Sequence, residues 1–223
     1  MESYRIGDNM KKILFLAIVL VALILPATVF AADQFIDMFI GGGTTGLTGT
    51  YDGYYPNDFV NHGHTINISN STFDFVFGVD YYWVLNKEHT FWMGIGSTLS
   101  MAYPALNSVS PETISIDVPF EYLFSPHFSI VVKPSLLGMW MPASLNKFSS
   151  ADLTGIGFSI AAGPAYYFDE HENIGVCLLA GYKYLPASCT DETGKYKTTF
   201  TGGGPFVSLY LSFELWSDDQ VEE

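Results

Sequence analysis

Apolar and polar side chains alternate with a period of two residues along most of this chain. Residues 72–84 show the pattern most clearly, because every second position is apolar while the positions between are mostly small, polar or acidic. The apolar positions in this run are Phe73, Phe75, Phe77, Val79, Tyr81 and Trp83. Such alternation predicts a β-strand with two different faces, since an α-helix would repeat its apolar positions about every 3.6 residues.

The same pattern predicts eight strands along the chain. They are expected at residues 34–47, 72–84, 91–103, 113–124, 128–140, 153–168, 174–184 and 206–216. Each run is long enough to cross a bilayer, for which a tilted strand needs about 9–11 residues. The connections between the runs alternate between short and long. The short ones are residues 85–90, 125–127 and 169–173, and the long ones are roughly 48–71, 104–112, 141–152 and 186–199. This alternation predicts an all-β, eight-stranded antiparallel transmembrane β-barrel with both termini at the short-turn end.

A soluble β-sandwich would also produce alternating strands. Two features favour the membrane barrel over it. The apolar parity carries aromatic residues near the strand ends, as at Phe73, Trp83, Phe91 and Tyr103, which is typical of membrane interfaces. The opposite parity is rich in Gly, Ala, Ser and Thr, which suits a narrow interior better than a hydrated surface. Composition agrees, because only 14% of the residues are charged, whereas a soluble domain carries about 25%.

The N-terminus has the features of an export signal. Lys11 and Lys12 precede an uncharged apolar run, Pro26 interrupts that run, and Val29 and Ala31 are small residues at the positions that precede a cleavage site. The alternative is an uncleaved transmembrane anchor, which the proline and the cleavage pattern disfavour. The expected organisation is a signal peptide at residues 1–31, a barrel at 32–216 and an acidic tail at 217–223. Residues 1–9 of the signal peptide lie upstream of a second candidate start, Met10.

With these features the chain resembles the small eight-stranded outer-membrane β-barrel proteins of the OmpX/OmpA-like or OmpW-like group. The resemblance covers residues 34–216 and rests on architecture and on a last strand that ends in an aromatic residue. It implies an assembly signal at Leu209, Leu211, Phe213 and Trp216, although here the acidic tail follows the aromatic residue. It also implies a Gram-negative outer-membrane location with periplasmic termini. The implied partners are outer-membrane lipid, the barrel-assembly machinery and periplasmic chaperones, and we expect a monomer.

Few charged side chains fall on the inward parity of the predicted strands. They are Asp37, Asp74, Asp80, Asp117, Glu121, Lys133, Lys183 and Glu214. Reflecting two strands about the turn at Pro126 sets Pro119 opposite Lys133, so that Asp117 and Glu121 lie diagonally to Lys133 on one face. We interpret this group as a structural ion cluster inside a barrel that its own side chains fill. The alternative is a narrow, cation-preferring pore, because acids outnumber lysines in the lumen.

The expected function is a structural, adhesive or narrow-channel role in the outer membrane, with no catalytic residue, cofactor or metal. The net charge of −14 excludes a nucleic-acid partner, because phosphate binding needs a basic surface. The alternative is an outer-membrane lipid-modifying enzyme, an acyltransferase or deacylase, with His62 and His64 at the outer rim. The sequence around these histidines shows none of the local patterns of such enzymes.

Two cysteines remain, and we expect them not to form a disulfide. Cys177 is expected near the short-turn end of a strand and Cys189 in the last long loop. A strand rises about 3.3 Å per residue, which separates the two by roughly 25–30 Å, whereas a disulfide needs Cα atoms within about 7 Å.

Overall fold

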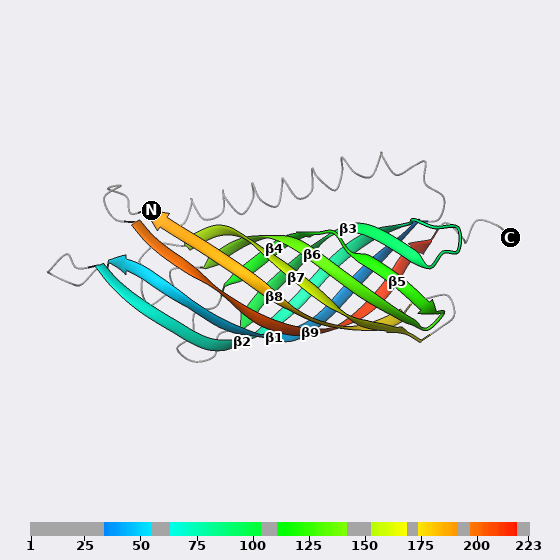
Figure 1. Ribbon diagram of the computed structural model, residues 1–223, viewed down its shortest axis with the longest axis horizontal. Coiled ribbons are helices and arrows are strands. Elements are labelled where there is room, and N and C mark those ends of the chain that lie inside the picture. Colours follow the sequence, from blue (N-terminus) through cyan, green and yellow to red (C-terminus); the bar gives the residue numbers. More distant parts are fainter. Residues whose placement is uncertain are drawn as a thin grey trace.

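In the computed structural model the chain is described over residues 34–54, 63–103, 111–141, 153–168, 174–190 and 197–217. These residues form a single antiparallel sheet that curls into a barrel (Figure 1). Its strands are β1 (Gln34–Tyr54), β2 (Gly63–Val84), β3 (Phe91–Tyr103), β4 (Glu112–Asp117), β5 (Phe120–Ser125), β6 (Phe128–Met141), β7 (Leu153–Tyr167), β8 (Ile174–Thr190) and β9 (Lys197–Ser217). No helix in these ranges has the length and hydropathy to span a membrane.

β4 and β5 are two parts of one wall strand, which was expected to be continuous over residues 113–124. The interruption falls at Val118 and Pro119, because a proline has no N–H to contribute to the ladder. The wall nevertheless continues across the interruption. The N–H of Val118 donates to the carbonyl of Pro134 at 3.0 Å, and the N–H of Gly94 donates to the carbonyl of Pro119 at 2.7 Å.

The wall therefore consists of eight strands, and it is closed. β1 pairs with β2 on one side and with β9 on the other, so the first and last strands meet. All the pairings in the described chain are antiparallel between neighbours, and β2–β3 pairing completes the ring. The predicted eight-stranded antiparallel barrel is confirmed.

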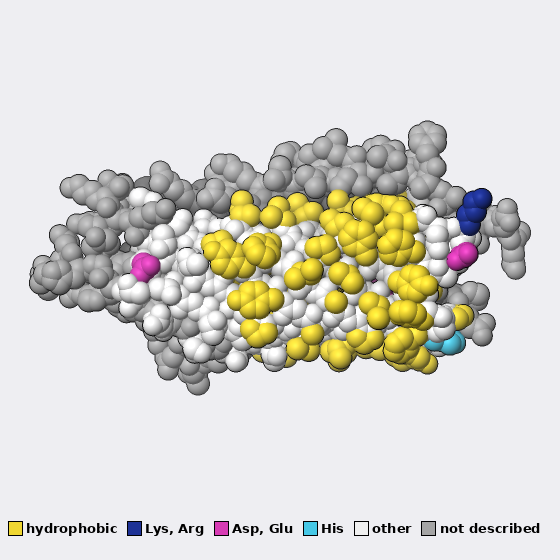
Figure 2. All heavy atoms as spheres, viewed as in Figure 1, with side chains coloured by type: hydrophobic (Ala, Val, Ile, Leu, Met, Phe, Trp, Pro, Cys, Tyr) yellow, Lys and Arg dark blue, Asp and Glu magenta, His cyan; other side chains and the backbone are white. Residues whose placement is uncertain are grey.

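The apolar parity of the strands faces outward, as the alternation predicts. On β2, Phe73, Phe75 and Phe77 are exposed, whereas Asp74 and Asp80 on the opposite parity are buried. On the face drawn in Figure 2, apolar side chains form a belt over the half of the barrel nearer the short turns. Beyond this belt the visible strands carry few apolar side chains. An apolar exterior around a hydrogen-bonded closed wall is the arrangement that lipid requires.

Four strands extend beyond their predicted ends, so the expected loops at 48–71 and 186–199 are wrong. β1 continues to Tyr54, β2 starts at Gly63, β8 continues to Thr190 and β9 starts at Lys197. Apolar alternation marks only the part of a strand whose outer face meets lipid. Backbone pairing needs no apolar face, so the ladder continues between polar residues such as Thr50 and Asn67.

The extension of β8 also moves Cys189 from the expected loop onto the strand that carries Cys177. Neither cysteine forms a disulfide, and Cys177 is buried while Cys189 is half-buried. Two residues twelve positions apart on one extended strand cannot approach to disulfide distance, so the expected separation holds although the loop position does not.

Buried side chains fill the barrel in three clusters along its length. The cluster toward the short turns contains Tyr82, Trp92 and Leu123, with Phe35 packed against it. The middle cluster contains Phe39, Val76, Val131, Ala161, Ala165, Tyr167, Cys177, Leu179 and Tyr210. The cluster toward the long connections contains Leu47, Leu137, Met139, Met141, Leu153, Leu185, Ala187 and Phe200. The interior is thus a packed core in which the charged residues are embedded.

Candidate functional site

The centre of the charged interior is Lys133 on β6, which is 7% exposed. Its Nζ lies 2.7 Å from Oδ2 of Asp80 and 3.4 Å from Oδ2 of Asp117. The ammonium also lies 4.1 Å from the ring centroid of Phe39, a cation–π contact. The hydroxyl of Thr98 donates to Oδ2 of Asp117. One buried ammonium is therefore shared by two carboxylates, and we call Lys133, Asp80 and Asp117 the shared-lysine cluster.

Glycines on the inward parity make room for this cluster. A Cβ on Gly78 would lie 2.2 Å from Cζ of Phe39, and a Cβ on Gly96 would lie 1.9 Å from Oδ1 of Asp80. Neither contact is possible for a real side chain, so the ring and the carboxylate occupy space that only glycine leaves free. The small residues between the apolar positions thus position the ions.

A second ion pair joins Lys183 on β8 to Asp74 on β2. Nζ of Lys183 lies 2.8 Å from Oδ2 of Asp74. The hydroxyl of Thr45 donates to the same oxygen, and the hydroxyl of Thr72 donates to Oδ1 at 2.9 Å. Both carboxylate oxygens of Asp74 therefore have partners, whereas of the two oxygens of Asp117 only Oδ2 has them.

Glu121 is also inside the barrel, but it does not pair with Lys133 as the diagonal register suggests. Phe120 lies opposite Val132, which agrees with the reflection about Pro126. The carboxylate of Glu121 instead accepts hydrogen bonds from the hydroxyls of Ser129 and Tyr167. Glu121 has Lys133 on one diagonal and Ser129 on the other. The hydroxyls of Ser129 and Tyr167 satisfy the carboxylate of Glu121, while the ammonium group of Lys133 extends across the lumen to Asp80.

The remaining inward charges lie toward the short turns. Asp37 on β1 is half-buried and lies opposite Asp80 in one ladder and opposite Glu214 in the other. A bulge between Ile36 and Asp37 shifts the register here. The sequence predicted eight inward charges by parity. The structure buries Asp74, Asp80, Asp117, Glu121, Lys133 and Lys183 and leaves Asp37 and Glu214 half-buried. The sequence could not identify Asp80 as the partner of Lys133, because two wall strands separate β2 from β6 and only barrel closure brings them across the lumen.

Other predicted positions fall partly outside the described residues. Leu209 and Leu211 of the implied assembly signal are exposed on β9, and Phe213 is half-buried. The side chain of Trp216, residue His62 and the signal peptide at 1–31 lie outside the described part of the chain. So does the tail after Ser217, the residue at which β9 ends. Of His64 only the backbone is described, and it pairs with Gly53.

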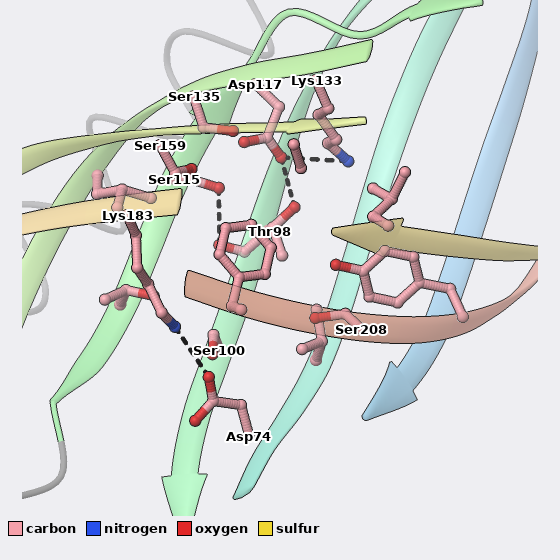
Figure 3. A pocket seen from close by; sticks show the side chains of 17 residues that line it. Asp74, Thr98, Ser100, Ser115, Asp117, Lys133, Ser135, Ser159, Lys183 and Ser208 are labelled. Atoms are coloured by element: carbon pink, nitrogen blue, oxygen red, sulfur yellow. Dashed lines mark hydrogen bonds and ion pairs between the residues drawn. The ribbon is translucent and has the colours of Figure 1, made fainter. Parts of the chain in front are cut away.

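A small cavity lies between the two ion pairs (Figure 3). Its volume is about 60 Å³, and carboxylates, ammonium groups and hydroxyls line much of it. The polar lining residues are Asp74, Thr98, Ser100, Thr113, Ser115, Asp117, Lys133, Ser135, Ser159, Lys183, Ser208 and Tyr210. Oδ1 of Asp117 is buried and has no hydrogen-bond partner. The arrangement can hold water or a small ion. Among the described residues no three or more His, Cys, Asp and Glu side chains gather into a group that could hold a metal ion.

Comparison with known proteins gives structural likeness only. No protein-family profile matches the chain, and no curated protein matches it. Among solved structures, the outer-membrane protein OprG from Pseudomonas aeruginosa is similar at 14% identity, over 82% of this chain and 97% of that one, with a TM-score of 0.48. Neisserial surface protein A is similar at 15% identity, over 79% and 96%, with a TM-score of 0.40. Ail, the attachment invasion locus protein of Yersinia pestis, is similar at 9% identity, over 82% and 100%, with a TM-score of 0.38. The barrel assignment itself rests on the closed register and the outward apolar face of this chain.

Proposed function

We propose that this chain is an integral bacterial outer-membrane β-barrel that is closed to solutes and acts through the end bearing the long connections. The role is structural or adhesive rather than conductive. The observation that carries the proposal is the filled interior, in which three packed clusters and two ion pairs occupy the lumen between Trp92 near the short turns and Phe200 toward the long connections. An eight-stranded barrel is just wide enough for its own side chains to fill it.

The end bearing the long connections supports a surface role. Beyond the apolar belt, the outward faces of the extended strands carry hydroxyl and amide side chains. Thr48, Asn67, Ser69 and Thr201 are exposed there. Such polar extensions present a hydrated surface, and binding functions concentrate on segments positioned in this way by a rigid scaffold. In this proposal the termini are periplasmic, residues 1–31 are a cleaved signal, and the partners are outer-membrane lipid, the barrel-assembly machinery and periplasmic chaperones.

A narrow cation-preferring channel is the second candidate, because carboxylates outnumber ammonium groups in the lumen. The carboxylates are Asp37, Asp74, Asp80, Asp117, Glu121 and Glu214, and the ammonium groups are Lys133 and Lys183. Planar-bilayer conductance separates the two candidates. We expect the folded, inserted chain to give no discrete current steps, with insertion verified by co-flotation with vesicles. Reproducible cation-selective steps from the inserted chain would replace the closed barrel with the channel.

We also propose that the chain does not modify lipids. Incubation of the purified barrel with labelled phospholipid and lipid A tests this directly. Turnover that disappears in His62→Ala or His64→Ala would establish the enzyme instead.

A further inference from the structure

We propose that the interior cavity beside Asp117 binds one small monovalent cation such as Na⁺. The site lies between the shared-lysine cluster and the Lys183–Asp74 pair, inside the wall formed by β3, β4 and β6 (Figure 3). It depends on the closed interior of the barrel and is independent of the surface role.

The first argument is the carboxylate oxygen that the protein leaves without a partner. Asp117 is 1% exposed, so water outside the barrel does not solvate it. Its Oδ2 interacts with both Thr98 and Lys133, whereas its Oδ1 is buried without a hydrogen bond. An unsatisfied buried oxygen of a charged group is strongly unfavourable. Because Asp117 lines the cavity, a ligand in that space can satisfy the oxygen.

The second argument is the local charge. The shared-lysine cluster and the Lys183–Asp74 pair together contain three carboxylates and two ammonium groups. They are those of Asp74, Asp80, Asp117, Lys133 and Lys183. With all of them ionised, this group carries one net negative charge, and the carboxylates of Asp37 and Glu121 add to the negative charge of the same lumen. An uncompensated charge in such surroundings is unfavourable. A cation beside Asp117 reduces this excess of negative charge, and the single free carboxylate oxygen at the cavity matches one positive charge.

The third argument is the chemistry and size of the lining. Hydroxyls of Thr98, Ser115 and Ser135 line the cavity together with Asp117. The hydroxyl of Ser115 donates to the carbonyl of Thr98 at 3.3 Å, which leaves its oxygen lone pairs available. Oxygen donors suit a hard cation. A cavity of about 60 Å³ has room for a bare ion together with several waters.

The test compares heat-induced unfolding of the detergent-folded chain in sodium chloride and in tetramethylammonium chloride at equal ionic strength. We expect the midpoint, followed by circular dichroism, to be about 3–5 °C higher in sodium chloride, as for a ligand at roughly ten times its Kd. Asp117→Asn should abolish this difference. Glu121→Gln, a matched carboxylate-to-amide change outside the cavity lining, should keep it.

Two further measurements cover the case in which Asp117→Asn does not fold. Ser135→Ala keeps every charge and should reduce the difference between the two salts. Crystals of the unaltered chain grown with thallium(I) in place of sodium should show an anomalous peak beside Oδ1 of Asp117. Equal midpoints of the unaltered chain in both salts, an undiminished difference in a folded Asp117→Asn, or the absence of that peak would each overturn the proposal.

Discussion

At the scale of single residues, the two interior lysines differ in the number of carboxylates that they contact. Lys133 is the only cation that contacts Asp80 and Asp117 among the described residues, and its loss leaves two buried carboxylates without an ionic partner. Lys183 contacts Asp74, which keeps hydrogen bonds from Thr45 and Thr72. Removing one partner of a buried ion pair is strongly unfavourable because it leaves an uncompensated charge.

We therefore expect Lys133→Met to destabilise the barrel more than Lys183→Met. The loss for Lys133→Met should be about 3–5 kcal/mol in the free energy of unfolding, and that for Lys183→Met should be smaller. Urea unfolding in detergent, followed by tryptophan fluorescence, measures both. Adding Asp80→Asn to Lys133→Met should restore part of the loss, because it removes one unpaired charge. Equal losses of stability for the two variants would contradict the inference that Lys133 neutralises two carboxylates and Lys183 only one.

At the scale of elements, the strands depend on where they carry glycine. Gly96 on β3 faces inward, and a Cβ there would lie 1.9 Å from Oδ1 of Asp80 and 2.6 Å from the carbonyl oxygen of Val79. Gly138 on β6 is on the outward parity, and its nearest neighbour would be Cγ2 of Ile114 at 3.3 Å. At Gly96 the added Cβ would collide with the Val79 carbonyl, which cannot move without breaking the backbone ladder. At Gly138 the added Cβ would meet a methyl group of Ile114, which can move.

Gly96→Ala should accordingly prevent folding or, in a variant that still folds, lower the free energy of unfolding by about 2–4 kcal/mol. Mutations cause losses of this size when they introduce strain or displace a buried ion pair. Gly138→Ala is the matched control and should change stability by less than about 1 kcal/mol. The faster migration of unboiled relative to boiled protein on a denaturing gel reports folding of both variants. Normal folding and stability of Gly96→Ala would mean that Asp80 does not occupy the space beside that glycine.

The sequence predicted the elements and faces well because both follow from alternation. Phe73, Phe75 and Phe77 identify the lipid-facing parity of β2, and β3 begins and ends where the pattern does, at Phe91 and Tyr103. Strand ends beyond the belt were not predictable, because polar pairs such as Thr50 and Asn67 carry no apolar signal.

The site was predictable only in part, for a different physical reason. Parity assigns each charge to the lumen, and the turn at Pro126 fixes the β5–β6 register. Contacts across the lumen depend on tilt and closure, which no local pattern encodes. Lys133 could therefore be placed among acids, but its preference for Asp80 over Glu121 required the closed barrel.

At the scale of the whole molecule, the apolar belt and the barrel differ in length. On β2 the last apolar outward residue toward the long connections that the structure describes is Phe73, and Ser71, Ser69, Asn67 and Thr65 follow it on the same face. At about 3.3 Å per residue, residues 63–71 add roughly 30 Å of strand beyond the belt. A barrel that projects so far from one side of its belt has an intrinsic polarity in the membrane.

That polarity makes orientation testable with two cysteine substitutions at exposed positions. An exported chain arrives in the periplasm, and insertion is simplest when only the hairpin ends cross the membrane while the termini and short turns stay behind. Ser69→Cys should therefore react with a membrane-impermeant maleimide on intact cells, and Lys87→Cys, in the 85–90 turn, only after lysis. The unaltered chain, with Cys177 buried and Cys189 half-buried, sets the background labelling. Reversed labelling would place the extended strands in the periplasm and remove the surface role. Labelling of both sites only after lysis would mean that the barrel does not reach the cell surface.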